Sequence, residues 1–243
     1  MNTQQWISEF LFTRALFQGP IGKPLYTYQV TEDEYLELVS LLKKACFDTH
    51  PVFTKPHPTA ACFCLFVAEY YRRYYNGNWD YAGAEEILKV QISQKDRSIL
   101  VKRGLEYWQR EVKTNNTGYN YLGSLFAEGG LPWPLVSGEQ HGFGRAIKRG
   151  IKNFYSSDDL KRSLTDLMQD YQKELPQSFQ NFETIQLLAA IVHQLMSYAQ
   201  QIPQEYKREP ARYLDQTVPE WNKAFPIPCL LYTSDAADEG LGV

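Results

Sequence analysis

The chain has 243 residues, of which 44% are hydrophobic, 14% aromatic and 22% charged. This length suffices for one large domain or two small ones, and such a chain buries roughly 70% of the surface that its unfolded form exposes. The formal charge is −3, so whole-chain electrostatics does not favour nucleic acid or an anionic membrane as a partner. Any such binding would need a local patch of positive charge.

Targeting signals and membrane spans are not expected. The most apolar run, residues 60–68, is far shorter than the ~20 residues that cross a bilayer. Residues 1–12 lack the charged start and small-residue cleavage site of a signal peptide. Cysteines 46, 62 and 64 precede residue 229, and an odd count without a signal peptide is typical of a reducing compartment. The sequence therefore predicts a cytoplasmic protein without a membrane partner.

Helical patterns follow one another along the chain, and no alternating strand pattern stands out. The second helix begins with a capping box, in which the side chains of Thr31 and Glu34 each accept a hydrogen bond from the backbone amide of the other residue. The third is apolar on every side over residues 60–68, which indicates burial on every side. A single multi-helix globular all-α domain is therefore expected. Its helices span residues 6–17, 31–45, 59–75, 81–90, 93–112, 119–127, 143–155, 157–175, 178–201 and 219–224.

The end of the third helix carries the first candidate site. Arg72 and Arg73 follow Glu69 at spacings of three and four residues, so an ion pair within the helix is available. In one interpretation, the two cations and the adjacent tyrosines form a pocket suited to a phosphate or a base. The alternative, which we favour, is a partly buried structural ion-pair network, because arginine is often retained for such pairing.

A second candidate segment ends the helix at 119–127. Gly129 and Gly130 let the backbone adopt positive φ and approach a ligand closely beside Glu128, although a neighbouring helix or a simple C-cap explains them equally well. An open cleft shared by both segments would favour an enzyme, whereas pairing inside the core would favour a scaffold. Catalytic residues stay unassigned. The candidate pocket comprises Glu69, Arg72, Arg73, Trp79, Glu128, Gly129 and Gly130.

The helix at 143–155 has the clearest charge pattern. Its cations recur at helical spacing above an apolar face, and they form one basic stripe: Arg145, Lys148, Arg149 and Lys152. Such a stripe is a candidate contact with a nucleic-acid backbone. An ordinary solvated helix face is the alternative.

No nucleotide-binding, hydrolase or zinc-protease motif is present. None of the four histidines has an acidic residue or a cysteine at ligand spacing. His193 is expected to pack near the apolar face of the last long helix. No metal and no cofactor are therefore expected.

The C-terminal residues 229–243 read CLLYTSDAADEGLGV. The stretch up to Glu239 resembles the translation of a transposon-end adapter used in DNA sequencing libraries. We therefore expect a non-native tail at 229–243 that can be deleted without loss of thermal stability, and we interpret residues 1–228 as the helical N-terminal domain of a longer, truncated protein. Without the three acidic residues of this tail, the formal charge becomes zero.

Four segments together carry a family resemblance: AEYYRR at 68–73, NGNW at 76–79, GLEYWQR at 104–110 and YLGSLFAEGGLP at 121–132. Their order and spacing resemble the N-terminal region of a family of very large bacterial proteins. These proteins are encoded in enterobacterial genomic islands beside a helicase gene and are linked to the Druantia type of antiphage defence. The resemblance implies other defence proteins, the helicase among them, as partners, but it carries over no catalytic residue.

The sequence thus predicts a helical interaction or scaffold domain of a multi-protein defence system. An enzyme with a Glu- and Arg-lined pocket, and a nucleic-acid-binding module that uses the basic helix, remain as alternatives.

Overall fold

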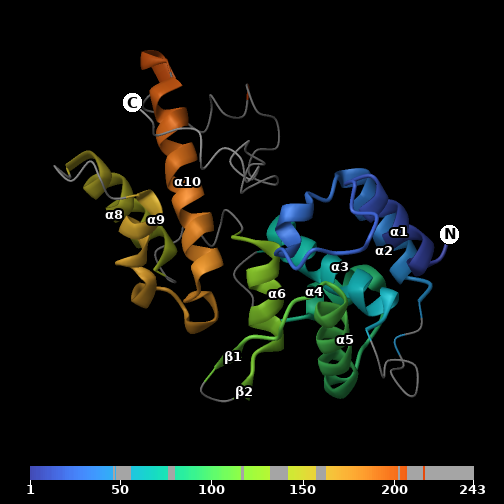
Figure 1. Cartoon of the computed structure of the whole chain (residues 1–243). Coiled ribbons are helices and arrows are strands. Elements are labelled where there is room, and N and C mark those ends of the chain that lie inside the picture. Colours follow the sequence, from blue (N-terminus) through green and yellow to red (C-terminus); the bar gives the residue numbers. More distant parts are fainter. Residues whose placement is uncertain are drawn as a thin grey trace. The chain divides into compact units, whose positions relative to one another are not determined.

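The computed structural model describes residues 1–45, 47, 56–75, 80–115, 118–131, 142–156, 163–201, 203–206 and 216. Nearly all regular structure in these ranges is helical, as Figure 1 shows, which confirms the all-α fold class. The chain divides into two compact units, Met1–Gly130 and Leu131–Val243.

The first unit begins with α1 (Thr3–Phe12), the short 3-10 helix η1 (Leu25–Tyr28) and α2 (Glu32–Leu42). It continues with α3 (Pro58–Tyr74), α4 (Ala82–Leu88), α5 (Gln94–Tyr107) and α6 (Tyr121–Gly129). Between α5 and α6, strands β1 (Thr114–Asn115) and β2 (Gly118–Tyr119) pair as an antiparallel hairpin. The sequence did not predict this hairpin, because two-residue strands are too short to show an alternating pattern.

Local side-chain caps define where these helices begin. The predicted capping box of α2 is present: the Thr31 hydroxyl accepts a hydrogen bond from the Glu34 amide, and the Glu34 carboxylate accepts one from the Thr31 amide. Ser93 caps α5 in the same way through the amide of Asp96. Such caps satisfy amides that the first helical turn leaves without partners, which explains why these boundaries could be read from the sequence.

Helix α3 is the centre of the first unit, as predicted. Helices α1, α2, α5 and α6 all contact it, and every residue from Thr59 to Glu69 is buried. The indole of Trp108 donates a hydrogen bond of 3.0 Å to the Ala61 carbonyl, so even the polar edge of this core ring is satisfied. A helix that is apolar on every side requires neighbours on every side, and this arrangement supplies them.

Helices α3 and α5 approach each other closely at Gly104. A Cβ atom on Gly104 would lie 2.3 Å from the Ala60 carbonyl oxygen and 2.4 Å from the Cys64 sulfur. The carbonyl belongs to the backbone of the central helix and cannot move aside without shifting that helix. Glycine at this position therefore sets the distance between the two helices.

Replacing Gly104 by alanine is expected to lower the free energy of unfolding by about 1–3 kcal/mol, the usual effect of overpacking a core. Gly150→Ala is the matched control, because there the new methyl group would meet the sulfur of the flexible Met168 side chain. Denaturant titration of both variants provides the measurement. A Gly104→Ala variant as stable as the parent would show that α5 can move away from α3.

The second unit contains α8 (Phe143–Ser156), α9 (Leu164–Gln169) and α10 (Phe182–Gln201), which contact one another. Short 3-10 helices, η2 (Gln172–Glu174), η3 (Gln177–Phe179) and η4 (Gln204–Tyr206), lie between and after them. Packing of Phe143 against Phe179, with ring centroids 5.1 Å apart, ties η3 to α8.

The helix expected at 157–175 is shorter in the structure. Residues 157–162 lie outside the described ranges, and α9 starts only after Ser163, whose hydroxyl accepts a hydrogen bond from the Asp166 amide. Helix α9 ends at Gln169, before the η2 turn. Leu175 is extended because it precedes Pro176. The hydrophobic pattern alone did not reveal this local capping and proline restriction.

Candidate functional site

Glu69 is the centre of the first charged cluster. Its side chain is only 1% exposed, and its carboxylate accepts hydrogen bonds from two guanidinium groups. Arg72 donates from Nε at 3.1 Å and from Nη2 at 2.5 Å, and Arg73 donates from Nε at 3.0 Å. Both predicted spacings within the helix are therefore used.

Arg73 extends this cluster from α3 to α2. Its guanidinium donates to the Val30 carbonyl at 2.8 Å, pairs with the Glu32 carboxylate, and lies 4.8 Å from the ring centroid of Tyr35. The Arg73 side chain is 7% exposed, so these contacts replace most of its hydration. This is the bonding of a cation that joins two helices, as the structural alternative predicted.

Glu128 belongs to a second cluster. Its side chain is 1% exposed, and its carboxylate accepts a hydrogen bond of 3.1 Å from the Leu25 amide and bonds of 3.0 and 2.9 Å from Nε and Nη2 of Arg110. Arg110 also donates from Nη1 to the Gly22 carbonyl at 3.0 Å. Burial raises the pKa of Glu128, while the charges of Arg110 and Lys113 oppose that rise.

The two glycines after Glu128 serve helix packing. A Cβ atom on Gly129 would lie 2.3 Å from the Ala68 carbonyl oxygen, so α6 runs directly against α3 here. Gly130 is the C-cap of α6, with φ +80°, and it packs against the ring of Tyr26. The close approach that the glycines permit is thus to another helix and a ring. Trp79, the remaining member of the candidate pocket, lies outside the described residues.

The sequence indicated Glu128 as a candidate residue but did not indicate its partner. Arg110 lies eighteen positions earlier in the chain, a separation at which no helical periodicity links two residues. Within the described residues, the acidic groups of the candidate pocket are therefore buried and paired: Glu69 with Arg72 and Arg73, and Glu128 with Arg110. Carboxylates bonded in this way brace the fold and have little capacity left for a substrate.

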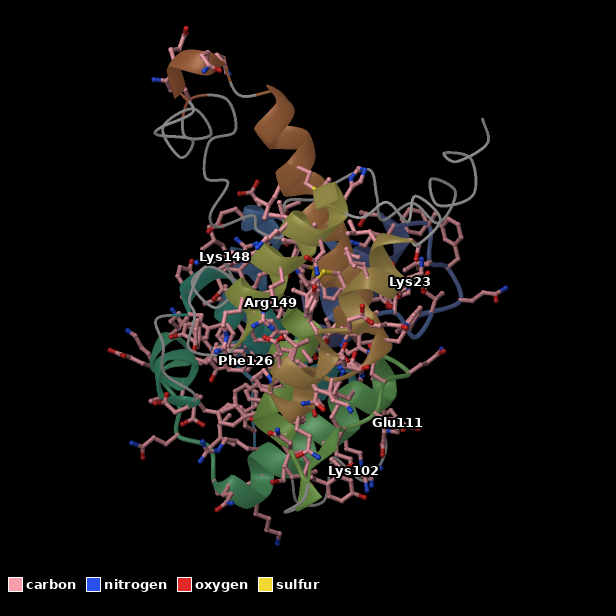
Figure 2. All side chains as sticks on the ribbon, turned by 90° about the vertical axis from the view of Figure 1, so that its left-hand side faces the viewer. Lys23, Lys102, Glu111, Phe126, Lys148 and Arg149 are labelled. Carbon is pink, nitrogen blue, oxygen red and sulfur yellow. The ribbon has the colours of Figure 1, made fainter. Side chains whose placement is uncertain are left out.

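The basic stripe lies on α8 in the second unit. All four cations, Arg145, Lys148, Arg149 and Lys152, are exposed, while Ala146 and Ile147 between them are buried. Lys148 and Arg149 are labelled in Figure 2. Arg149 pairs with Glu174 and nevertheless keeps 56% of its side chain exposed. The stripe is thus a solvated face whose positive charge is partly offset by an acidic neighbour.

The other candidate groups do not form a site in the described part of the chain. Cys62 and Cys64 are buried, burial raises the pKa of both thiols, and Cys64 donates from its sulfur to the Val101 carbonyl. His57 accepts from the Thr59 amide and so caps α3. His193 is exposed, which corrects the expectation that it packs.

Neither a metal cluster nor a membrane-spanning helix is found among the described residues. Three or more His, Cys, Asp or Glu residues that could hold a metal ion do not come together there. Among the described helices, none combines the length and apolarity needed to cross a membrane.

Two models of known protein families match the chain. The family model described as the YjiT N-terminal domain matches residues 1–131, more than half of the chain. The chain belongs to the YjiT family. The model of the YjiT second domain matches residues 138–238, so the boundary between the two matches falls near the boundary between the two compact units.

A curated relative supports this membership. Protein YjiT of Escherichia coli strain K12 is 29% identical over 234 residues, covering 92% of this chain. The alignment covers 43% of the length of that relative, so the chain spans less than half of it. No solved structure matches the chain significantly.

The second YjiT match also overlaps the expected tail. It extends to residue 238 and so includes part of residues 229–243. These residues lie outside the described ranges, and their origin from an adapter stays a prediction.

Proposed function

We propose that this YjiT-family chain is a helical interaction domain of a larger cytoplasmic assembly, which acts in bacterial antiphage defence together with a helicase. The observation that best supports the scaffold role is that Glu69 and Glu128 are each paired with arginines. Both carboxylates are 1% exposed and bonded to arginines of the same unit. Acidic residues that brace helices support a role in binding other proteins more than a role in catalysis.

The defence setting rests on the segments that resemble the genomic-island family, above all YYRR at 70–73 and EGGLP at 128–132. In the structure, residues of both segments make contacts between helices. Arg73 joins α3 to α2, and Gly129 lets α6 reach α3. They are therefore parts of the framework on which any interaction surface of this unit is built.

Co-purification tests the proposal. The full-length protein would be tagged and expressed together with the helicase encoded beside its gene, and we expect the helicase to be retained on the affinity resin and to co-elute in gel filtration. Deleting the gene should also raise the plating efficiency of phage on a strain that carries the island. A helicase that elutes separately, with phage plating unchanged, would exclude this function.

The alternative favoured by a specific observation is direct binding of nucleic acid through α8, since all four cations of the stripe are exposed. Four phosphate contacts would make log K fall with log salt at a slope of about −3 to −4. Binding of duplex and single-stranded DNA at two salt concentrations measures that slope.

Charge reversal of the stripe gives a further prediction. The triple change Arg145→Glu, Lys148→Glu and Lys152→Glu is expected to abolish nucleic-acid binding and to alter the free energy of unfolding by only about 0.5 kcal/mol per position, as is usual for surface changes. Lys23→Glu, on the loop before η1, is the control for charge alone. Binding that survives the triple reversal would leave protein contact as the role of α8.

A further inference from the structure

A small cavity lies where α3 ends and α4 begins in the first unit. Its volume is about 220 Å³. The α3 side is made of tyrosines, and the α4 side brings two acidic residues and a glycine; the lining residues are Tyr70, Tyr71, Tyr74, Tyr75, Asp80, Ala82, Gly83 and Glu86. We propose that this cavity, which we call the tyrosine pocket, binds the headgroup of an alkylammonium cation.

Neighbouring rings that line the tyrosine pocket are inclined to one another. The centroids of Tyr70 and Tyr74 are 5.6 Å apart with planes inclined by 41°, and those of Tyr70 and Tyr71 are 5.3 Å apart and inclined by 73°. Tyr74 is 42% exposed, so part of this residue is accessible from solvent. Inclined electron-rich rings surround a cation from several sides, which is how proteins recognise quaternary and methylated ammonium groups.

The charge of the pocket selects the same class of ligand. Asp80 and Glu86 are exposed, and the described lining includes no lysine or arginine. Burial, followed by the charges of Asp80 and Glu86, raises the pKa of Tyr70, so its phenol stays neutral at physiological pH. An anion such as a phosphate would be repelled by both carboxylates, whereas an ammonium group gains from both.

Its size limits the ligand to a headgroup. Pockets that hold drug-sized molecules measure ~300–1,000 Å³, and this cavity is smaller. A trimethylammonium or primary ammonium group fits this description, either on a free small molecule or on the side chain of a lysine. A nucleotide does not.

Gly83 keeps the α4 side of the pocket open. A Cβ atom at this position would lie 2.0 Å from the Tyr70 hydroxyl oxygen and would force that ring to move. Asp80 is held from both sides, since its Oδ1 accepts a hydrogen bond of 2.9 Å from the Ala82 amide of α4 and its carbonyl accepts one from the Tyr71 hydroxyl of α3. The acid and the ring are thus positioned by local contacts before any ligand arrives.

The experiment uses choline and its neutral isostere 3,3-dimethyl-1-butanol as probes. Each would be titrated into the full chain while the NMR signals of labelled tyrosine rings are followed. We expect saturable shifts with choline and binding at least about tenfold weaker for the neutral alcohol, because the two molecules differ in charge and hardly in shape. Equal binding of the two, or no saturable shift with choline, would overturn the proposal.

Matched variants locate the binding. Tyr74→Leu removes an accessible ring and should weaken choline binding about tenfold, and Glu86→Gln should weaken it several-fold. The controls, Tyr119→Leu and Glu111→Gln, change an exposed ring and an exposed acid outside the pocket and should leave the affinity unchanged. Equal losses in the controls would overturn the assignment to this pocket.

Two further arms complete the test. Gly83→Ala should displace Tyr70 and lower the affinity, with circular dichroism reporting whether the fold is retained. N-acetyl-lysine amide and its trimethylated form distinguish the sources of the cation: tighter binding of either than of choline indicates a protein side chain, and tighter binding of choline indicates a free ligand. This inference does not depend on the proposed defence role.

Discussion

Replacing Phe66 by alanine is expected to lower the free energy of unfolding by ~3–5 kcal/mol. The Phe66 side chain is fully buried near the middle of α3, where it stacks on Tyr35 at a centroid distance of 5.8 Å and contacts Tyr70 at 6.3 Å. Alanine would leave a ring-sized cavity between α2 and α3, and the helices around that cavity cannot move together to fill it. Denaturant titration followed by circular dichroism measures the loss.

Phe17→Ala is the control for this prediction. Phe17 is 72% exposed, so removing its ring should change stability by no more than about 0.5 kcal/mol. If both variants unfolded at the denaturant concentration of the parent, α3 would not be the centre of the core, and the arrangement of α1, α2, α5 and α6 around it would be wrong.

The position of α3 could be predicted because the signal is local. Residues 60–68 are apolar on every side of the helix, and that pattern alone requires burial. The Thr31–Glu34 capping box is local for the same reason, since both partners lie within one turn. Exposure of the basic stripe on α8 followed from helical spacing in the same way.

The features that could not be predicted depend on contacts between distant segments. Leu25 donates to Glu128 across 103 positions, and no pattern in either segment indicates the other. The division after Gly130 is equally hidden, since helical periodicity continues on both sides of it. The tyrosine pocket needs the end of α3 and the start of α4 together, so the YYRRYY run at 70–75 showed the rings but not the acidic side.

Replacing Arg110 by methionine is expected to have the other large effect, a loss of ~3–5 kcal/mol at neutral pH. Arg110 donates two hydrogen bonds to the Glu128 carboxylate and one to the Gly22 carbonyl. Methionine fills much of the same volume but leaves a carboxylate that is 1% exposed with the Leu25 amide as its remaining described donor. Denaturant titration at pH 7 measures the loss.

The pH dependence of that loss identifies the buried charge as its cause. Burial already raises the folded-state pKa of Glu128 above its ordinary value of 4.5, against the opposing charge of Arg110. An acid with a raised folded-state pKa contributes stability below its unfolded pKa and loses it as pH rises through the folded-state pKa. Removing Arg110 raises the folded-state pKa further, so the stability deficit of the variant should be smallest near pH 4 and grow toward pH 7.

Adding Glu128→Gln removes the charge, and the double variant should regain part of the stability at pH 7 with a deficit that no longer grows with pH. A deficit that is flat with pH in the single variant, or a double variant no more stable than the single one at pH 7, would show that Arg110 acts through packing and not through the charge of Glu128.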